Sequence, residues 1–555
     1  MSTSKIQTMA FLLGVTLLGV PMAQSAVPGT ADPQAACAGL ARLPVADATI
    51  VSASAVGAGR FVPPPAPYAP DLGERAAKMP AFCRVEVVAT PTPDSKIGIE
   101  IWLPLLDWNG RLLGTGNGGG AGSIAYGMGM IEGLRRGFAV ANTDLGTAPD
   151  VNQTIDHPER WADFGHRATH EMTRLAKLVV SGFYGVESFR SFFEGCSTGG
   201  QQALGSAQRY PDDYDGILAG DPGNNRTHVH TSFLWNYNAL NETPHSRLSG
   251  ADLSMVSKAV IASCGGKDGG APGDAFLTDP RQCHFNPETL TKCEAGADVG
   301  QCLTAPKLTA LRKMYEGAVN PRTGERIYAG LTAGSENQPL GPSLQGDPDA
   351  WPIQQFYPFL WAFGQSFQAR TFDFDHDFDR LDAFLSSRLN ANGTDLSDFR
   401  RRGGKAMIYT GLADPAVPFQ EVVNYYERAV AARGDLASTQ EFLRLFLVPG
   451  MGHCFGGPGA TNFGQPFSSV VPSDPKADGL MSLVHWVEEG RAPDSLLATR
   501  YGVGGEGPGV QARRSICAYP KFPEYTGGDL SAPSSFRCAE RERGSAMPPA
   551  ARYLN

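Results

Sequence analysis

Short apolar segments typical of strands alternate with segments of helical spacing along much of this chain. The stretch 188–195 predicts a strand that runs into the motif "GCSTG" at 195–199, and the stretch 200–211 predicts a helix. Strands that alternate with helices form a mostly parallel sheet covered on both faces. A serine on a sharp turn between such a strand and helix is typical of α/β-hydrolases. The pattern therefore predicts an α/β fold of the α/β-hydrolase type.

The amino-terminal segment predicts export. Lys5 precedes a short apolar run, and small residues follow it, as in a secretory signal peptide over residues 1–25. The apolar run is too short to favour a membrane span, and no later segment resembles one. The formal net charge of −9 argues against a nucleic-acid partner. We expect a secreted or periplasmic protein with no membrane span and no nucleic-acid partner.

The predicted strand–helix pattern is interrupted in the middle of the chain. Residues 224–397 contain four cysteines, many glycines and prolines, and an aromatic cluster, and strand character returns at 404–411. We predict one catalytic domain built from residues 26–223 and 398–555, with residues 224–397 inserted as a lid domain. The alternative is a functionally independent domain, but the catalytic segments on either side need each other.

A histidine and an acid later in the chain complete the chemistry that the serine requires. Asp414 follows the strand-like stretch 404–411, and His453 follows another at 441–448. The order Ser197, Asp414, His453 is that of α/β-hydrolases, and parallel sheets build sites at the carboxyl ends of strands. His453 would take the serine proton, and Asp414 would hold the imidazole tautomer. Singly, Asp414 is also explained as a turn residue and His453 as a surface-loop histidine.

The glycine run 116–120 predicts the oxyanion hole. In α/β-hydrolases one backbone N–H comes from a loop after an early strand, and another from the residue after the nucleophile. We assign these donors to Gly119 and Thr198. The alternative for the glycine run is a flexible surface turn.

The ten cysteines suggest disulfides, because an exported chain with an even number of cysteines is typically cross-linked. Cys196 and Cys454 flank the nucleophile and the histidine, so they lie within disulfide reach if Ser197 and His453 form a hydrogen bond. Spacing alone leaves the connectivity open. The other eight fall into pairs close in sequence or plausibly close in space: Cys37 with Cys83, Cys264 with Cys283, Cys293 with Cys302, and Cys517 with Cys538.

Four stretches of the chain resemble the tannase/feruloyl esterase family: "GCSTGGQQAL", "YPDDYDGILAGDP", "GLADPAVPF" and "LVPGMGHCFGGPG". The resemblance covers nearly the whole mature chain. It implies an α/β-hydrolase with a large lid, a small-molecule substrate that is an ester of an aromatic acid, and no cofactor for catalysis. It also implies the five disulfides paired as above, including Cys196 with Cys454.

The family includes a mono(2-hydroxyethyl) terephthalate hydrolase, and that activity is the alternative enzymatic function. Thr198 stands where that enzyme has a glutamate. The arginine with which its lid grips the free carboxylate of the substrate has no clear counterpart here, and Arg370 is only the nearest arginine. A catalytically silent binding protein is the alternative of another class, since fold does not fix function. Within the lid, the candidate substrate contacts are three aromatic residues that are otherwise explained as lid core: Trp361, Phe363 and Phe367.

The family also binds calcium in its lid, in a loop after a cysteine, and the corresponding stretch here is 264–280. Calcium prefers several carboxylate and carbonyl oxygens. Gly265 stands where the family has its first aspartate, which weakens the site. The alternative is a glycine-rich turn without a metal. The implied ligands are the carboxylates of Asp268 and Asp274 and the carbonyls of Gly270 and Phe276.

Overall fold

The computed structural model describes residues 32–66, 69–294, 300–468, 470–502 and 509–543. The predicted signal peptide, residues 1–25, lies outside the described residues. Within the described part, no helix is both long and apolar enough to cross a bilayer.

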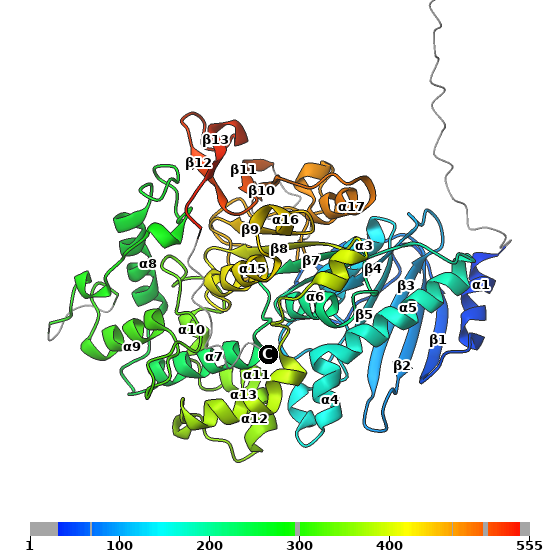
Figure 1. Cartoon of the computed structure of the whole chain (residues 1–555), viewed down its shortest axis with the longest axis horizontal. Helices are drawn as coiled ribbons and strands as arrows, with labels where there is room; N and C mark the ends of the chain where they lie inside the picture. Colours follow the sequence, from blue (N-terminus) through cyan, green and yellow to red (C-terminus); the bar gives the residue numbers. More distant parts are fainter. Residues whose placement is uncertain (1–31, 67–68, 295–299, 469, 503–508, 544–555) are drawn as a thin grey trace, which may run out of the picture.

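A nine-stranded sheet forms the centre of the molecule, with the strand order β1-β2-β3-β5-β4-β6-β7-β8-β9 (Figure 1). The strands from β1 through β2 and β3 to β5 pair antiparallel, and those from β5 onward pair parallel. The strands are β1 (Ala48–Val56), β2 (Phe82–Ala89), β3 (Ile97–Pro104), β4 (Arg111–Thr115), β5 (Ala139–Thr143), β6 (Arg190–Cys196), β7 (Gly216–Gly220), β8 (Lys405–Gly411) and β9 (Leu443–Val448).

Helices cover both faces of this sheet, as the sequence pattern predicts. Neighbouring residues of one strand enter different cores because side chains alternate across a sheet. Phe193 and Ile217 pack in the core that contains α5, α6 and α15, whereas Phe192 and Leu218 pack in the core that contains α3 and α17. The helices outside the predicted lid are α1 (Pro33–Gly39), α2 (Leu72–Ala76), α3 (Ile131–Arg135), α4 (Pro158–Ala162), α5 (Ala168–Tyr184), α6 (Thr198–Arg209), α15 (Phe419–Arg433), α16 (Leu436–Gln440) and α17 (Gly479–Glu489).

The segment after the predicted signal peptide adds a strand that the sequence analysis does not identify. Residues 48–56 form the edge strand β1, which pairs with β2, and the disulfide between Cys37 and Cys83 ties α1 to β2. Four of the nine residues of β1 are exposed, and the other five are half-buried. An edge strand needs only one apolar face, so its small and polar residues hid it from the sequence pattern.

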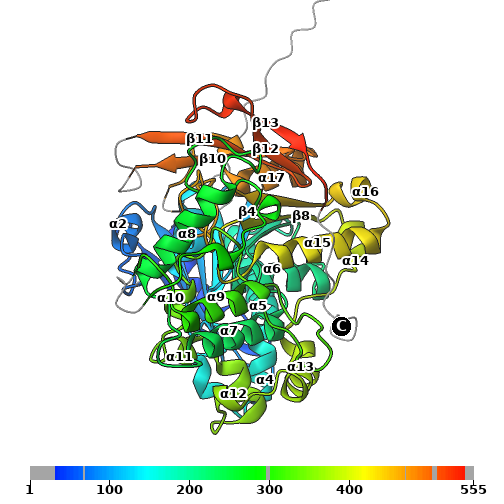
Figure 2. The ribbon, with the colours of Figure 1, turned by 90° about the vertical axis from the view of Figure 1, so that its left-hand side faces the viewer.

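The described residues between β7 and β8 contribute helices and no strand to the sheet. Figure 1 shows these helices gathered on one side of the sheet, and Figure 2 shows α7 to α10 in front of it. Those around α8 and α9 have a small core of their own, whereas α11 to α13 pack into the main core. The boundaries at 224 and 397 stay a prediction. The helices are α7 (Arg226–Leu240), α8 (Gly250–Cys264), α9 (Ala305–Glu316), α10 (Pro342–Gln345), α11 (Trp351–Gln355), α12 (Tyr357–Phe363), α13 (His376–Leu389) and α14 (Ser397–Arg401).

The carboxyl-terminal part adds two antiparallel strand pairs, the first in contact with β9 through β11 and the second in contact with β11 (Figure 1). The pairs are β10 (Ser495–Tyr501) with β11 (Val510–Cys517), and β12 (Lys521–Tyr525) with β13 (Phe536–Glu540).

All ten cysteines are paired, and the five disulfides are those implied by the family resemblance. Their Cα–Cα distances lie between 4.9 and 5.8 Å, within the range that a disulfide spans. The bridge between Cys196 and Cys454 joins residues 258 positions apart and links the end of β6 to the loop after β9.

We expect peptide mapping of the unreduced protein to recover five cystine-linked peptide pairs, with no cysteine alkylated before reduction. The double variant Cys196→Ala/Cys454→Ala is the matched control, and it should retain the other four links. Alkylation of Cys196 in the folded, unreduced protein would contradict the structure.

Candidate active site

Ser197 lies on a sharp turn between β6 and α6. Its φ of 63° and ψ of −117° are unusual for a residue with a side chain, and such strained serines are typical of the nucleophile turn of hydrolases. The turn needs glycines on either side, because a Cβ on Gly195 would lie 2.6 Å from the Gly199 carbonyl oxygen, and one on Gly200 would lie 2.3 Å from the Gly220 oxygen. The motif is therefore explained by close backbone packing around the serine.

Asp414 and His453 come together at the same edge of the sheet, after β8 and β9. The His453 Nδ1 and the Asp414 Oδ2 are 2.7 Å apart. The other carboxylate oxygen of Asp414 accepts hydrogen bonds from the N–H groups of Ala416 and Val417, at 2.7 and 3.0 Å. Among the described residues no hydrogen bond joins the Ser197 hydroxyl to His453. Catalytic hydrogen bonds are often long in unliganded enzymes and shorten when substrate binds.

The environment of His453 raises its pKa. Burial by itself lowers the pKa of this imidazole, but the charge of Asp414 and the hydrogen bond to it oppose burial and outweigh it. Asp414 is fully buried, so its carboxylate acts on His453 with little screening by water. The pair can therefore hold a proton that arrives from a nearby hydroxyl.

The Cys196–Cys454 disulfide fixes the two halves of this arrangement to each other. Cys196 directly precedes Ser197, and Cys454 directly follows His453. The bridge therefore limits the separation of the serine turn and the histidine loop, as the sequence analysis expects.

Asp221 is a further buried acid at the site, and the sequence analysis did not identify it. It follows β7, and its carboxylate accepts hydrogen bonds from Cys454 N (2.8 Å), Gly411 N (2.7 Å) and Thr410 Oγ1 (2.9 Å). Burial and the nearby charge of Asp414 raise its pKa. Its position at the carboxyl end of a parallel strand, in "LAGDP", was a signal of the kind used for Asp414.

Arg226, at the start of α7, brings a positive charge close to the site. It is buried, its Nε donates to Gln201 Oε1 at 2.6 Å, and its guanidinium lies over the ring of Phe164. Its charge opposes the rise in the pKa of His453. Sequence reasoning missed this residue because nothing local distinguishes it from other arginines at helix starts.

The glycine run lies against the serine turn, as an oxyanion loop would. Gly199 N donates to Asn117 O at 2.8 Å, and a Cβ on Gly116 would lie 2.4 Å from the Gly199 Cα. Within the described chain, the backbone N–H groups of Gly119 and Thr198 have no acceptor. Two free donors beside a serine turn suit an anionic oxygen.

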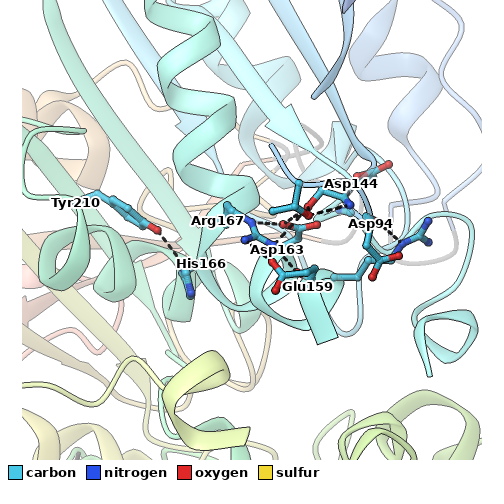
Figure 3. Close-up of polar contacts among 11 residues, drawn as sticks. Asp94, Asp144, Glu159, Asp163, His166, Arg167 and Tyr210 are labelled. Carbon is cyan, nitrogen blue, oxygen red and sulfur yellow. Dashed lines mark hydrogen bonds and ion pairs between the residues drawn. The ribbon is translucent and has the colours of Figure 1, made fainter. Parts of the chain in front are cut away.

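A polar cluster supports the loop after β5, which packs against the glycine run. Figure 3 shows Asp163 in contact with Arg167, Asp144 beside them, and His166 with Tyr210 as a separate pair. Asp144 Oδ1 accepts from Gly146 N at 2.7 Å, and burial raises the pKa of Asp144 to about 6. This loop also accepts a hydrogen bond from Gly122 N through the Asp144 carbonyl, at 3.1 Å.

The three aromatic residues proposed as substrate contacts pack with other aromatic side chains. Trp361 is 4% exposed and stacks on Trp161, with ring centroids 5.6 Å apart. Phe363 and Phe367 stack on each other at 5.8 Å. The structure thus places Trp361 between the inserted helices and α4, and a substrate-binding role for any of the three stays a prediction.

The loop expected to bind calcium does not fit that ion. Asp268 accepts hydrogen bonds from backbone N–H groups of the loop itself, and Asp274 pairs with Arg514 at 3.0 Å. Gly270 is one of these backbone donors, and Phe276 packs its ring against Gly450. Within the described loop, no three acidic, histidine or cysteine side chains lie close enough together to hold a metal ion. Calcium needs several oxygens directed at one point, and here both carboxylates are already engaged.

Comparisons with known proteins agree with this geometry. A family model described as tannase and feruloyl esterase matches residues 83–539. An uncharacterized esterase of Xanthomonas campestris pv. campestris is 37% identical and covers 93% of each chain. A mono(2-hydroxyethyl) terephthalate hydrolase of Piscinibacter sakaiensis is 32% identical over 84% of this chain and 86% of its own.

A solved structure gives the same result. The crystal structure of feruloyl esterase B from Aspergillus oryzae superimposes with a TM-score of 0.82 at 27% identity, covering 92% of this chain and 100% of that one. The predicted α/β-hydrolase fold and the predicted ester hydrolase are confirmed. The chain belongs to the tannase and feruloyl esterase family, and it is a carboxylic ester hydrolase for a small-molecule ester.

Proposed function

We propose that this protein is a secreted serine esterase that hydrolyses esters of aromatic acids through an acyl-enzyme on Ser197. The observation that carries the proposal is the 2.7 Å contact between His453 and Asp414, on the loop that the Cys196–Cys454 bridge ties to the serine turn. A nucleophile with an adjacent base and an orienting acid is the arrangement that acyl transfer requires.

The proposed reaction has two steps of the same kind. Ser197 Oγ attacks the ester carbonyl carbon while His453 takes the hydroxyl proton, and His453 then gives this proton to the leaving alcohol. Water, deprotonated by His453, then attacks the acyl carbon, and His453 returns the proton to Ser197 Oγ as the bond between serine and acyl group breaks and the acid leaves. Asp414 stabilises the imidazolium, and the N–H groups of Gly119 and Thr198 receive the oxyanion. The nucleophile, base and donors all belong to the chain, so the mechanism needs no cofactor.

The aromatic substrate is supported by the relatives and by the inserted helices. The similar proteins are named for feruloyl and terephthalate esters, whose acids are aromatic. The inserted helices carry many aromatic rings, which offer flat apolar surface to an aromatic acyl group. Export is supported by the predicted signal peptide and by the five disulfides, which persist in oxidising compartments.

Terephthalate monoester hydrolysis is the second candidate, because one relative of similar coverage bears that name. Arg370 does not favour it, since its Nη2 donates to the carbonyl oxygen of Asn241 within the inserted region. A silent binding protein is disfavoured by the Asp414–His453 contact.

We expect a fluorophosphonate probe to label Ser197 in the folded protein, and Ser197→Ala to abolish labelling and ester turnover. His453→Ala should lose most turnover, by roughly 10³-fold or more, because the hydroxyl loses its base. Activity and labelling in folded Ser197→Ala would contradict the assignment.

The pH dependence provides an internal control for the same triad. Only a neutral imidazole accepts the serine proton, so kcat/KM should fall as the pH drops below the pKa of His453. Because this pKa is raised, the fall should begin at a pH above 6.5, the ordinary pKa of histidine. Asp414→Asn removes the charge that raises this pKa, so the acid limb should move to lower pH while kcat falls. An unchanged limb and near-normal turnover in folded Asp414→Asn would reject Asp414 as the partner.

We expect methyl ferulate, methyl gallate or chlorogenate to be hydrolysed with a higher kcat/KM than a short aliphatic ester such as ethyl butyrate. Mono(2-hydroxyethyl) terephthalate belongs in the same panel, because a clear preference for it would select the second candidate. A preference for the aliphatic ester would reject the aromatic substrate while leaving the esterase in place.

A further inference from the structure

The hydroxyl of Thr198 makes a contact that the proposed mechanism does not use. Thr198 Oγ1 donates a hydrogen bond to the carbonyl oxygen of Gly119, at 2.7 Å. Thr198 is buried, so water does not compete for this bond. The side chain of one proposed oxyanion donor thus binds the carbonyl group of the residue that carries the other.

The glycine run is anchored at several points, and the bond from Thr198 is the anchor at Gly119 itself. The first residues are held by backbone contacts, since Gly116 N donates to Glu194 O at 2.9 Å and Gly199 N to Asn117 O at 2.8 Å. Gly119 has a φ of +55°, a conformation that a glycine adopts without strain, and there is open space where its Cβ would be.

We propose that Thr198 is a positioning residue for the oxyanion hole, in addition to the role of its backbone N–H. Its hydroxyl fixes the distance between the Gly119 and Thr198 N–H groups before substrate binds. Preorganised donors stabilise charge that develops in the transition state, so a looser loop costs rate more than substrate affinity. This inference rests on the proposed serine mechanism.

The test compares Thr198→Val, which keeps the shape and removes the hydroxyl, with Thr198→Ser, which keeps the hydroxyl. Thr198→Val should lower kcat by roughly tenfold and leave KM within about twofold, because the bond acts on oxyanion stabilisation. Thr198→Ser should recover most of the kcat that Thr198→Val loses, because it keeps the hydroxyl. Thr198→Ala serves if the valine variant does not fold.

The Ki of an inhibitor that forms an oxyanion separates loss of the oxyanion contacts from a general loosening of the fold. Only a loss of the oxyanion contacts should change this Ki in step with kcat. A trifluoromethyl ketone adds to the serine as a hemiketal, so its Ki should rise across the variants in proportion to the fall in kcat/KM. A constant Ki, or a loss in Thr198→Ser as large as in Thr198→Val, would overturn the proposal. If the wild type takes no fluorophosphonate label, the proposed serine mechanism itself is rejected. If it is labelled but Ki stays constant, only the positioning role of Thr198 is rejected.

Thr147 offers a matched control, because its hydroxyl also anchors the glycine run. Its Oγ1 donates to the carbonyl oxygen of Gly120 at 2.9 Å, but it comes from the loop after β5 and not from the serine turn. Thr147→Val should therefore lower kcat less than Thr198→Val. An equal loss would mean that any anchor of the loop serves, and the specific role of Thr198 would be rejected.

A second inference comes independently from the loop that lacks the calcium geometry. Arg514, on β11, reaches both oxygens of Asp274, with Nη2 to Oδ1 at 3.0 Å and Nη1 to Oδ2 at 3.2 Å. The same guanidinium lies over the ring of Phe536, 3.9 Å from its centroid. A planar guanidinium is well suited to such a bidentate contact.

We infer that Arg514 supplies the positive charge that calcium would bring, and so fastens loop 264–283 to the carboxyl-terminal strands without a metal. Asp268 is 2% exposed and its oxygens accept from Gly270 N and Asp279 N, each at 3.1 Å. The disulfide between Cys264 and Cys283 closes the loop at its ends. The loop is therefore held at its ends by the disulfide, at Asp268 by its own backbone and at Asp274 by Arg514.

Thermal unfolding of the whole protein tests this arrangement. The Tm should be unchanged by EDTA or by millimolar calcium chloride, and elemental analysis after dialysis should find no stoichiometric calcium. Arg514→Met should lower the Tm by several degrees, because it leaves a nearly buried carboxylate unpaired. Arg537→Met is the control, since its pair with Glu524 is exposed and should change the Tm little.

A fall in Tm with EDTA that calcium restores would overturn the inference, as would an Arg514→Met variant as stable as the wild type. Arg514→Lys serves if the methionine variant does not fold. It keeps the charge but loses the bidentate contact, so a smaller loss of stability is expected.

Discussion

Four parallel strands, β6 to β9, end at one edge of the central sheet, and the site depends on this shared register. The residues after these strands are Ser197, Asp221, Asp414 and His453, which are far apart in sequence. Because the strands are parallel, the chain leaves each of them at the same edge of the sheet, and the four loops that follow lie next to one another. The helices on both faces bury the strands and keep that register in place.

Charge burial is the second feature that shapes the site. One carboxylate oxygen each of Asp414 and Asp221 and one ring nitrogen of His453 lie within 4.8 Å of one another. Arg226 lies close enough for its charge to lower the pKa of the imidazole. Two neighbouring acids in a buried place are costly unless donors surround them. Backbone N–H groups supply those donors for both acids, and the one from Cys454 links Asp221 to the histidine loop. The path of the backbone in these loops therefore supplies the hydrogen bonds that stabilise the two buried carboxylates.

Cross-links hold the outer parts of the molecule to this centre. The Cys196–Cys454 bridge joins the two catalytic loops, and the Arg514–Asp274 pair joins the inserted region to the terminal strands. The insertion itself is divided, because α8 and α9 have a separate core while α11 to α13 share the main one. A change in α8 or α9 is thus partly insulated from the sheet, whereas a change near Trp361 reaches α4 directly.

Local pattern was sufficient for the fold class and for the strand ends that carry Ser197, Asp414 and His453. Strand periodicity, glycine spacing and motif order are properties of short stretches, and the fold class they indicate agrees with the comparisons. The edge strand β1 was missed because only one of its faces needs apolar residues. Tertiary structure alone decided that Asp221 lies beside Asp414, that the Thr198 hydroxyl meets Gly119, and that Arg514 takes Asp274. Each of these contacts joins residues from separate elements, and their distance depends on how the whole chain packs, which no short stretch of sequence encodes.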